Sequence, residues 1–182
     1  MATCFLLVFM LLLSWLVADG CYTSIISFGD SLADTGNIKE LDRYYNIEPP
    51  HFLFLPYGET YFHKPTGRCS NGRLIIDFVA EGLGLPLIPP FTGWARINDG
   101  DREVMGFKQG MNYAVAGATA LDSSFLEARG VHNPLTNASL GVQLEWFKES
   151  LPLLCSTSSG KCFTELVEDV KFSRHYPNIY TK

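Results

Sequence analysis

The apolar positions along the chain predict short strands that alternate with helices. Residues 22–28 are β-branched and aromatic and end at Gly29, a pattern typical of a short buried strand. Two more strands are predicted, one over residues 85–88 and one over residues 111–116, which run into Gly117. Because this alternation favours a mainly parallel sheet covered by helices, we predict an α/β fold.

Two segments carry apolar side chains at helical spacing. Residues 73–83 follow Ser70 and Asn71, either of which can cap a helix, and residues 139–154 form a second amphipathic pattern. We expect the apolar faces of both helices to pack in the core: Leu74, Ile75, Phe78, Val79 and Leu83 in the first, and Leu140, Leu144, Phe147, Leu151 and Leu154 in the second.

The other segments are interpreted as loops or interrupted helix. Residues 31–45 are compatible with a helix that Gly36 interrupts, and residues 46–68 and 92–110 are predicted as loops. Aromatic side chains are dense over residues 44–62, where they either line an acyl or phenolic pocket or pack the loop against the core. We favour packing.

The N-terminal apolar run indicates secretion. Residues 4–18 are shorter than the roughly 20 residues of a membrane-spanning helix and suit the core of a signal peptide. Ala18 and Gly20 are small, so we expect cleavage before Cys21, with residues 1–20 as the signal peptide. The chain is then extracellular, with no stable membrane span after cleavage. The alternatives are an uncleaved anchor and a buried first helix.

The cysteines fit an oxidising compartment. Four remain after the predicted cleavage, and they can form disulfides in three pairings that we leave open: Cys21, Cys69, Cys155 and Cys162. A turn-rich hexapeptide between the last two makes a local bridge one of these pairings. Asn137 begins the single N-glycosylation triplet, and we expect it to be glycosylated. No Cys or His spacing is typical of zinc, so we expect no metal site.

Composition sets broad limits on function. The chain has 182 residues, of which 47% are hydrophobic and 18% charged, and this predicts a folded domain. Its net charge of −5 argues against a nucleic-acid partner. The sequence leaves the oligomeric state open.

Ser31 is the strongest candidate for chemistry. It follows a predicted buried strand and begins a predicted helix, where free N–H groups can stabilise an oxyanion as a hydroxyl attacks an ester carbonyl. The alternative is structural, because Ser31-x-x-Asp34 is also a capping pattern, and spacing alone favours it. For Asp34 itself, we expect a capping role.

Four stretches together resemble the plant-type GDSL esterase/lipases, a branch of the SGNH hydrolases. They are FGDSLADTGN at residues 28–37, PTGRCSNGR at 65–73, GMNYAVAGA at 110–118 and SLGVQLEWF at 139–147. The resemblance runs from about residue 21 to residue 155.

The resemblance implies a flavodoxin-like three-layer αβα fold and hydrolysis of carboxylic esters without a cofactor or metal. It makes Ser31 the nucleophile and the backbone N–H groups of Ser31 and Gly117 two donors of an oxyanion hole. The substrate is then a small-molecule or lipid ester. The supporting positions of the motif are Gly29, Asp30, Asp34 and Asn37.

Two blocks of the family have no counterpart in the sequence. Asn98-Asp99 lacks the glycine of the GxND block, and no His lies three residues after an Asp, as the DxxH block requires; Asp169 and His175 are six apart. The other histidines are His51, His63 and His132. We therefore expect neither the general base nor the triad Asp in this chain.

This pattern implies an incomplete domain. We expect residues 21–155 to form the N-terminal part of the hydrolase domain, residues 156–182 to be a divergent tail, and activity to be absent or very low because a serine without a base is a weak nucleophile. The alternatives are an inactive short isoform with a binding or regulatory role, and a product that never folds alone.

Overall fold

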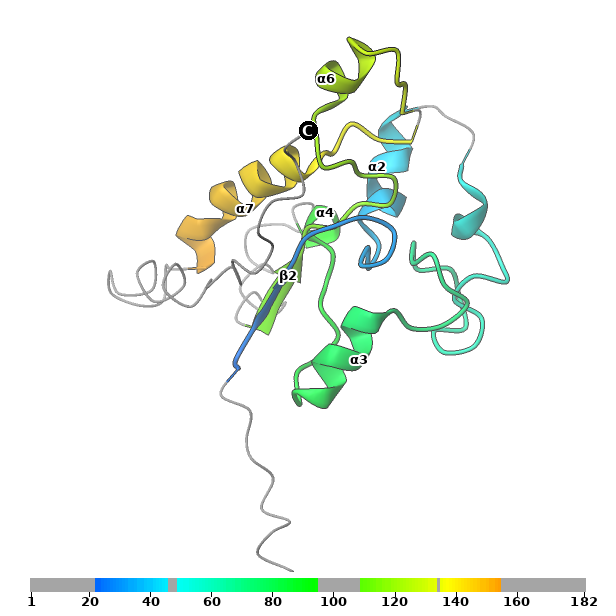
Figure 1. Ribbon diagram of the computed structural model, residues 1–182. Helices are drawn as coiled ribbons and strands as arrows, with labels where there is room; N and C mark the ends of the chain where they lie inside the picture. Colours follow the sequence, from blue (N-terminus) through cyan, green and yellow to red (C-terminus); the bar gives the residue numbers. More distant parts are fainter. Residues whose placement is uncertain (1–21, 46–48, 95–108, 134, 155–182) are drawn as a thin grey trace, which may run out of the picture.

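The computed structural model describes residues 22–45, 49–94, 109–133 and 135–154 (Figure 1). The elements are strand β1 (Ile25–Ser27), helix α2 (Asn37–Tyr45), the 3-10 helix η1 (His51–Leu53), helices α3 (Ile75–Gly82) and α4 (Phe91–Trp94), strand β2 (Gly110–Asn112), and helices α6 (Ser123–Glu127) and α7 (Leu140–Leu154). In Figure 1, α7 lies on one side of the strands and α2 and α3 lie on the other.

Several sequence-based expectations fall outside the described residues. They concern the signal peptide, the tail, Cys21, Cys155, Cys162, Asn98-Asp99, Asp169 and His175. No helix in the described ranges is long and apolar enough to cross a membrane.

The strands β1 and β2 form a parallel pair, as the alternating pattern predicts. Ile25 is opposite Gly110 and Ser27 is opposite Asn112. Beyond β2, the N–H of Tyr113 donates to the Ser27 oxygen at 2.8 Å, so the contact continues toward the carboxyl ends of both strands. Residues 111–116 are at most 1% exposed. The parallel strands and flanking helices agree with the predicted α/β class.

The predicted strand over residues 85–88 does not form. The segment contacts the sheet through an isolated bridge between Pro90 and Asn112, with the Asn112 N–H donating to the Pro89 oxygen at 3.0 Å. Three of residues 85–90 are prolines, which have no N–H to donate to a strand partner. The apolar run therefore packs beside the sheet, with Ile88 only 2% exposed, without extending it.

Helix α3 forms within the predicted range, but its predicted core face is wrong. Ile75 is 75% exposed and Phe78 is 51% exposed, whereas Asp77 and Ala80 are fully buried. The reason is that the Asp77 carboxylate pairs with a buried arginine, described below, and this turns the Asp77 side of the helix inward. Leu74, just before the helix, is buried as expected.

Helix α7 forms as predicted, with a different buried face. Leu140 and Leu144 are each 38% exposed, while Gln143 and Ser150 are buried. Both buried side chains have partners: Gln143 bonds to the backbone of Gly29, and the Ser150 hydroxyl is 2.6 Å from that of Tyr113. Phe147 and Leu151 are half-buried, and the side chain of Leu154 lies outside the description.

Among the described residues, the core holds two apolar clusters that share a neighbour. The first holds Ile38, Phe52, Val115, Ala116 and Ala138, and the second holds Phe91, Met111 and Tyr113. Trp146 of α7 packs against both clusters. Phe52 shows that an aromatic side chain of the loop over residues 49–68 packs in the core, whereas Phe54 is 56% exposed.

Candidate active site

Ser31 lies in a turn that follows β1. The oxygen of Asp30 accepts the N–H groups of Ala33 and Asp34, both at 3.0 Å, and the Asp30 side chain accepts the N–H of Leu32 at 3.0 Å. Asp30 therefore shapes the turn that presents Ser31, which is half-buried. Helix α2 begins only at Asn37, so the expectation that Ser31 starts a helix is wrong.

Asp34, and not Ser31, caps helix α2. Its Oδ1 accepts the N–H groups of Gly36 at 2.7 Å and Asn37 at 2.6 Å, and its Oδ2 accepts that of Ile38 at 3.1 Å. The same Oδ2 accepts the N–H of Ala116 at 2.7 Å. Burial raises the pKa of Asp34 to about 6, and the four N–H donors oppose this rise. One carboxylate thus joins the Ser31 turn to the chain that follows β2.

Asn37 fastens α2 to the sheet. Its Nδ2 donates to the oxygens of Asn112 and Ala114, both at 2.8 Å, and its Oδ1 accepts from the N–H and the hydroxyl of Thr92, both at 2.9 Å. The side chain is fully buried and its hydrogen-bonding capacity is used. The predicted supporting position is therefore a structural anchor for both ends of the site.

Gly117 follows β2 in a conformation that suits glycine. Its φ is +82°, and an added Cβ would lie 2.8 Å from the Cβ of Leu135. The Gly117 oxygen accepts from the Asn133 side chain at 2.7 Å. Both the backbone angle and the lack of space therefore exclude a larger residue here.

The loops that hold Ser31 and Gly117 lie side by side. The N–H of Val115 donates to the oxygen of Gly29 at 3.1 Å. Gly29 is two residues before Ser31, and Val115 is two residues before Gly117. Within the described ranges, the backbone N–H groups of Ser31 and Gly117 donate to no acceptor. An oxyanion site needs unpaired N–H donors of this kind, and ligands bind at the carboxyl ends of parallel strands in α/β sheets.

A cleft of about 320 Å³ opens beside this pair of loops. Residues 28–33 line it, with the exception of Ser31, together with residues 118–120 and the side chains of Leu140 and Gln143. Asp30 and Leu32, on either side of Ser31, both contribute to its wall. No residue of the aromatic segment 49–62 lines it.

Gln143 is a site residue that sequence reasoning missed. Its Oε1 accepts the Gly29 N–H at 2.9 Å, and its Nε2 donates to the Gly29 oxygen at 2.8 Å and the Ala138 oxygen at 3.2 Å. The available signal was a glutamine three residues after Leu140, next to the predicted apolar stripe.

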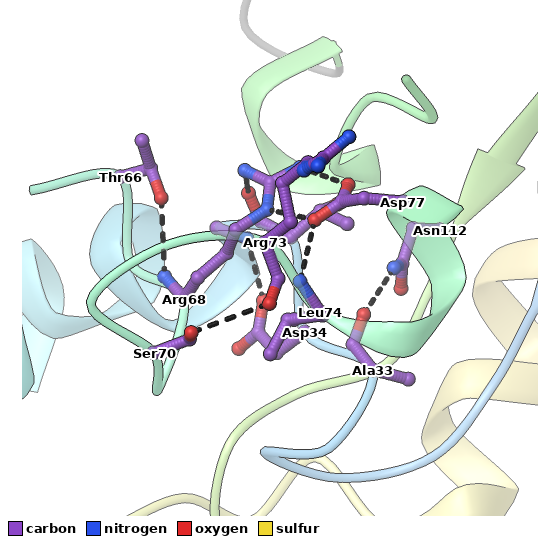
Figure 2. A network of polar contacts seen from close by, with 11 residues as sticks. Ala33, Asp34, Thr66, Arg68, Ser70, Arg73, Leu74, Asp77 and Asn112 are labelled. Atoms are coloured by element: carbon purple, nitrogen blue, oxygen red, sulfur yellow. Dashed lines mark hydrogen bonds and ion pairs between the residues drawn. The ribbon is translucent and has the colours of Figure 1, made fainter. Parts of the chain in front are cut away.

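A buried ion pair, also missed, supports the turn from the other side (Figure 2). The Arg68 guanidinium donates to both oxygens of Asp77, at 2.9 and 2.8 Å, and to the oxygen of Thr35 at 2.9 Å. Asp77 also accepts the N–H of Leu74 at 2.9 Å. The PTGR–SNGR segment and α3 are thereby held against the residues that follow Ser31.

The remaining predicted positions have simpler surroundings. Cys69 is the one cysteine in the described ranges; burial, reinforced by the charges of Asp34 and Asp30, raises its pKa to about 11. Asn137 is exposed. The disulfide and glycosylation predictions stay predictions.

No described histidine bonds to Ser31. His51 packs against the rings of Phe52 and Tyr57, His63 contacts the Glu59 oxygen at 3.1 Å, and His132 is an exposed residue 4.0 Å from Glu127. The described residues include no group of three or more potential metal ligands.

Comparisons with known proteins place this geometry in a family. The profile of the GDSL-like lipase/acylhydrolases matches residues 25–156. Two GDSL esterase/lipases of Arabidopsis thaliana are 59% and 60% identical over 138 residues, which cover 76% of this chain and 33% of each relative. A sinapine esterase of Brassica napus is 54% identical over 141 residues, 78% of this chain and 34% of that protein.

The chain spans about a third of the length of these relatives. No solved structure matches it. The family match and the identities confirm the resemblance drawn from the four motifs: the chain belongs to the GDSL-like lipase/acylhydrolase family.

Proposed function

We propose that this chain carries the nucleophile and two oxyanion-hole donors of a serine hydrolase that cleaves carboxylic ester bonds. The observation that carries the proposal is the placement of Ser31 and Gly117 after paired parallel strands, with unpaired backbone N–H groups. Membership of the GDSL-like lipase/acylhydrolases supports the same reaction class.

In the proposed reaction, the Ser31 hydroxyl attacks the acyl carbonyl and forms a tetrahedral intermediate. The N–H groups of Ser31 and Gly117 donate to its oxyanion, the intermediate expels the alcohol, and water then hydrolyses the acyl-serine. No described histidine bonds to Ser31, so water accepts the serine proton and supplies the proton of the departing alcohol. We therefore expect this chain by itself to react slowly.

Labelling with a fluorophosphonate tests the role of Ser31 directly. We expect slow covalent labelling of the 182-residue chain that is lost in Ser31→Ala, and a rate at least 100-fold below that of the sinapine esterase of Brassica napus, because an unassisted hydroxyl is a poor nucleophile (on the order of 10²–10⁴-fold from a general base). Labelling that persists in Ser31→Ala contradicts the proposed nucleophile. Labelling as fast as the relative contradicts the expected lack of a base.

The substrate proposal follows from the cleft and one relative. Phe28, Leu32, Ala118 and Leu140 give the cleft an apolar wall beside the Ser31 turn, which suits an apolar or aromatic acyl group. Because one relative is a sinapine esterase, sinapine is the first ester to test, alongside a short-chain lipid ester.

We also propose that the chain is secreted after removal of residues 1–20. The apolar run at residues 4–18 and the small residues before Cys21 support this. Expression in plant cells and N-terminal sequencing of the secreted product test it. A first residue of Cys21 is expected, and retention of residues 1–20 contradicts cleavage.

A further inference from the structure

We infer that Gln143 is a positioning residue for the proposed nucleophile, acting through Gly29; this rests on the proposed role of Ser31. Gln143 lies on the first turn of α7 and is fully buried. Its amide bonds to both the N–H and the oxygen of Gly29, at 2.9 and 2.8 Å, across 114 residues of sequence.

A glutamine can bond to both backbone groups of Gly29 because its side-chain amide has the donor and acceptor of a peptide group. Gly29 lies where the chain leaves β1, and its oxygen also accepts the N–H of Val115 from the β2 side at 3.1 Å. Gln143 supplies the partner from the α7 side. Its third bond, to the Ala138 oxygen at 3.2 Å, orients the amide. The Gln143 amide therefore gives Gly29 the two hydrogen bonds that a neighbouring strand would otherwise supply.

The conformation of Gly29 needs this support. Its φ is +142°, in the region that L side chains rarely adopt, and an added Cβ would meet only Ala33 at 3.8 Å. The backbone angle, and not a lack of space, therefore favours glycine here, and the bonds from Gln143 and Val115 hold the Gly29 backbone at this angle. Since Asp30 and Ser31 follow directly, the direction of the Gly29 backbone sets where the Ser31 turn begins.

The first turn of α7 also holds the loop that follows Gly117. The N–H of Leu140 donates to the oxygen of Thr119 at 2.9 Å, and the hydroxyl of Ser139 bonds to Asp122. One helical turn thus contacts the loop of the nucleophile and the loop of the second oxyanion donor. Loss of the Gln143 amide removes the contact of α7 with Gly29 and leaves its contact with Thr119 in place.

The test replaces Gln143 with Met, which has a similar length but no hydrogen-bonding amide. The matched control is Ser150→Ala, seven residues further along the same helix, which removes the buried bond to Tyr113. Three quantities are measured in the 182-residue chain: the melting temperature, the fluorophosphonate labelling rate of Ser31, and hydrogen exchange of the Gly29, Ala33 and Asp34 amides.

We expect Gln143→Met to speed exchange of all three amides and to slow labelling at least about tenfold, because a misplaced nucleophile loses much of its reactivity. Ser150→Ala is expected to lower the melting temperature while leaving exchange of those amides and labelling unchanged. The inference is overturned if Gln143→Met leaves exchange unchanged, or if Ser150→Ala slows labelling as much as Gln143→Met does.

The two proposals fail in different ways. Labelling of the wild-type chain that persists in Ser31→Ala contradicts the proposed nucleophile, and the exchange of Gly29, Ala33 and Asp34 then decides alone whether Gln143 holds the turn. A wild-type chain that is labelled, with unaltered labelling and exchange in Gln143→Met, overturns the role of Gln143 and leaves Ser31 in place.

Discussion

Two regions of the chain show opposite relations between polarity and burial. Around the Ser31 turn, Asp34, Asn37 and Gln143 are fully buried, and each bonds to the backbone of a distant segment. On helix α3, the apolar side chain of Ile75 is 75% exposed. Bonds from side chain to main chain, as well as hydropathy, therefore decide which residues this chain buries.

The largest expected effect comes from breaking the buried ion pair that turns α3 inward. Asp77→Ala leaves the Arg68 guanidinium buried without its carboxylate and should lower the free energy of unfolding by about 3–5 kcal/mol. Urea denaturation measures this. The double variant Arg68→Met with Asp77→Leu, which removes both charges, should recover much of the loss. A cost below about 1 kcal/mol for Asp77→Ala would contradict the role given to the pair.

A pH series tests the electrostatic state of the buried cap. The pKa of Asp34 is raised to about 6 in the folded chain, above its ordinary value of 3.8. The folded state therefore holds a proton that the unfolded state releases, so this contribution to stability is complete below about pH 4 and is lost as the pH rises through about 6. The loss amounts to at most about 3 kcal/mol.

The control for that series is Asp34→Asn, which cannot titrate. Between pH 4 and pH 7, the wild-type chain should lose stability relative to Asp34→Asn. Urea denaturation at each pH measures the difference. A difference that stays constant across this range would show that the Asp34 pKa is the same in both states.

Removing the anchor of α2 should have the next largest effect. Asn37→Ala removes the amide that donates to the oxygens of Asn112 and Ala114 and should cost about 2 kcal/mol of unfolding free energy. Lys39→Ala on the same helix is a suitable control, because its side chain makes a single, partly exposed bond at 3.3 Å. Equal losses of unfolding free energy in the two variants would contradict a stabilising role for the buried bonds of Asn37.

The smallest effect is expected on the outer face of α3. Ile75→Ala should change stability by less than about 0.5 kcal/mol, because the side chain is already in water. Its neighbour Leu74, 8% exposed, should cost about 2–3 kcal/mol when changed to Ala. Similar losses of unfolding free energy at both positions would show that Ile75 is buried, as the sequence pattern predicts.

The spacing of apolar residues was sufficient to predict the strands and helices that depend on neighbours in sequence. The run ending at Gly29, the strand before Gly117 and the helix over residues 139–154 could all be predicted, and with them the places of Ser31 and Gly117. Hydropathy did not predict which faces are buried, because burial there depends on hydrogen-bond and ion-pair partners outside the helix. The bonds of Gln143 to Gly29 and of Asp34 to Ala116 span 114 and 82 residues.

Prolines explain the failed strand. A run such as residues 85–90 has the hydropathy of a buried strand, yet its three prolines remove the donors that pairing needs. The start of α2 failed for a related reason: the Asp34 side chain accepts the N–H groups of residues 36–38 and sets the first turn of the helix there. Counting the backbone N–H donors of residues 85–90 would have found the first error, and the capping role expected for Asp34 already pointed to the second.

The bond between Gly29 and Gln143 has a consequence for synthesis of the protein. A ribosome adds about 5–20 residues per second, so the 114 residues that separate the two partners take about 6–23 s to make. During that interval the turn that holds Ser31 exists without its anchor on α7. The nascent chain therefore passes through a period in which chaperones can bind the apolar strand before Gly29, and the site closes only after α7 has been made.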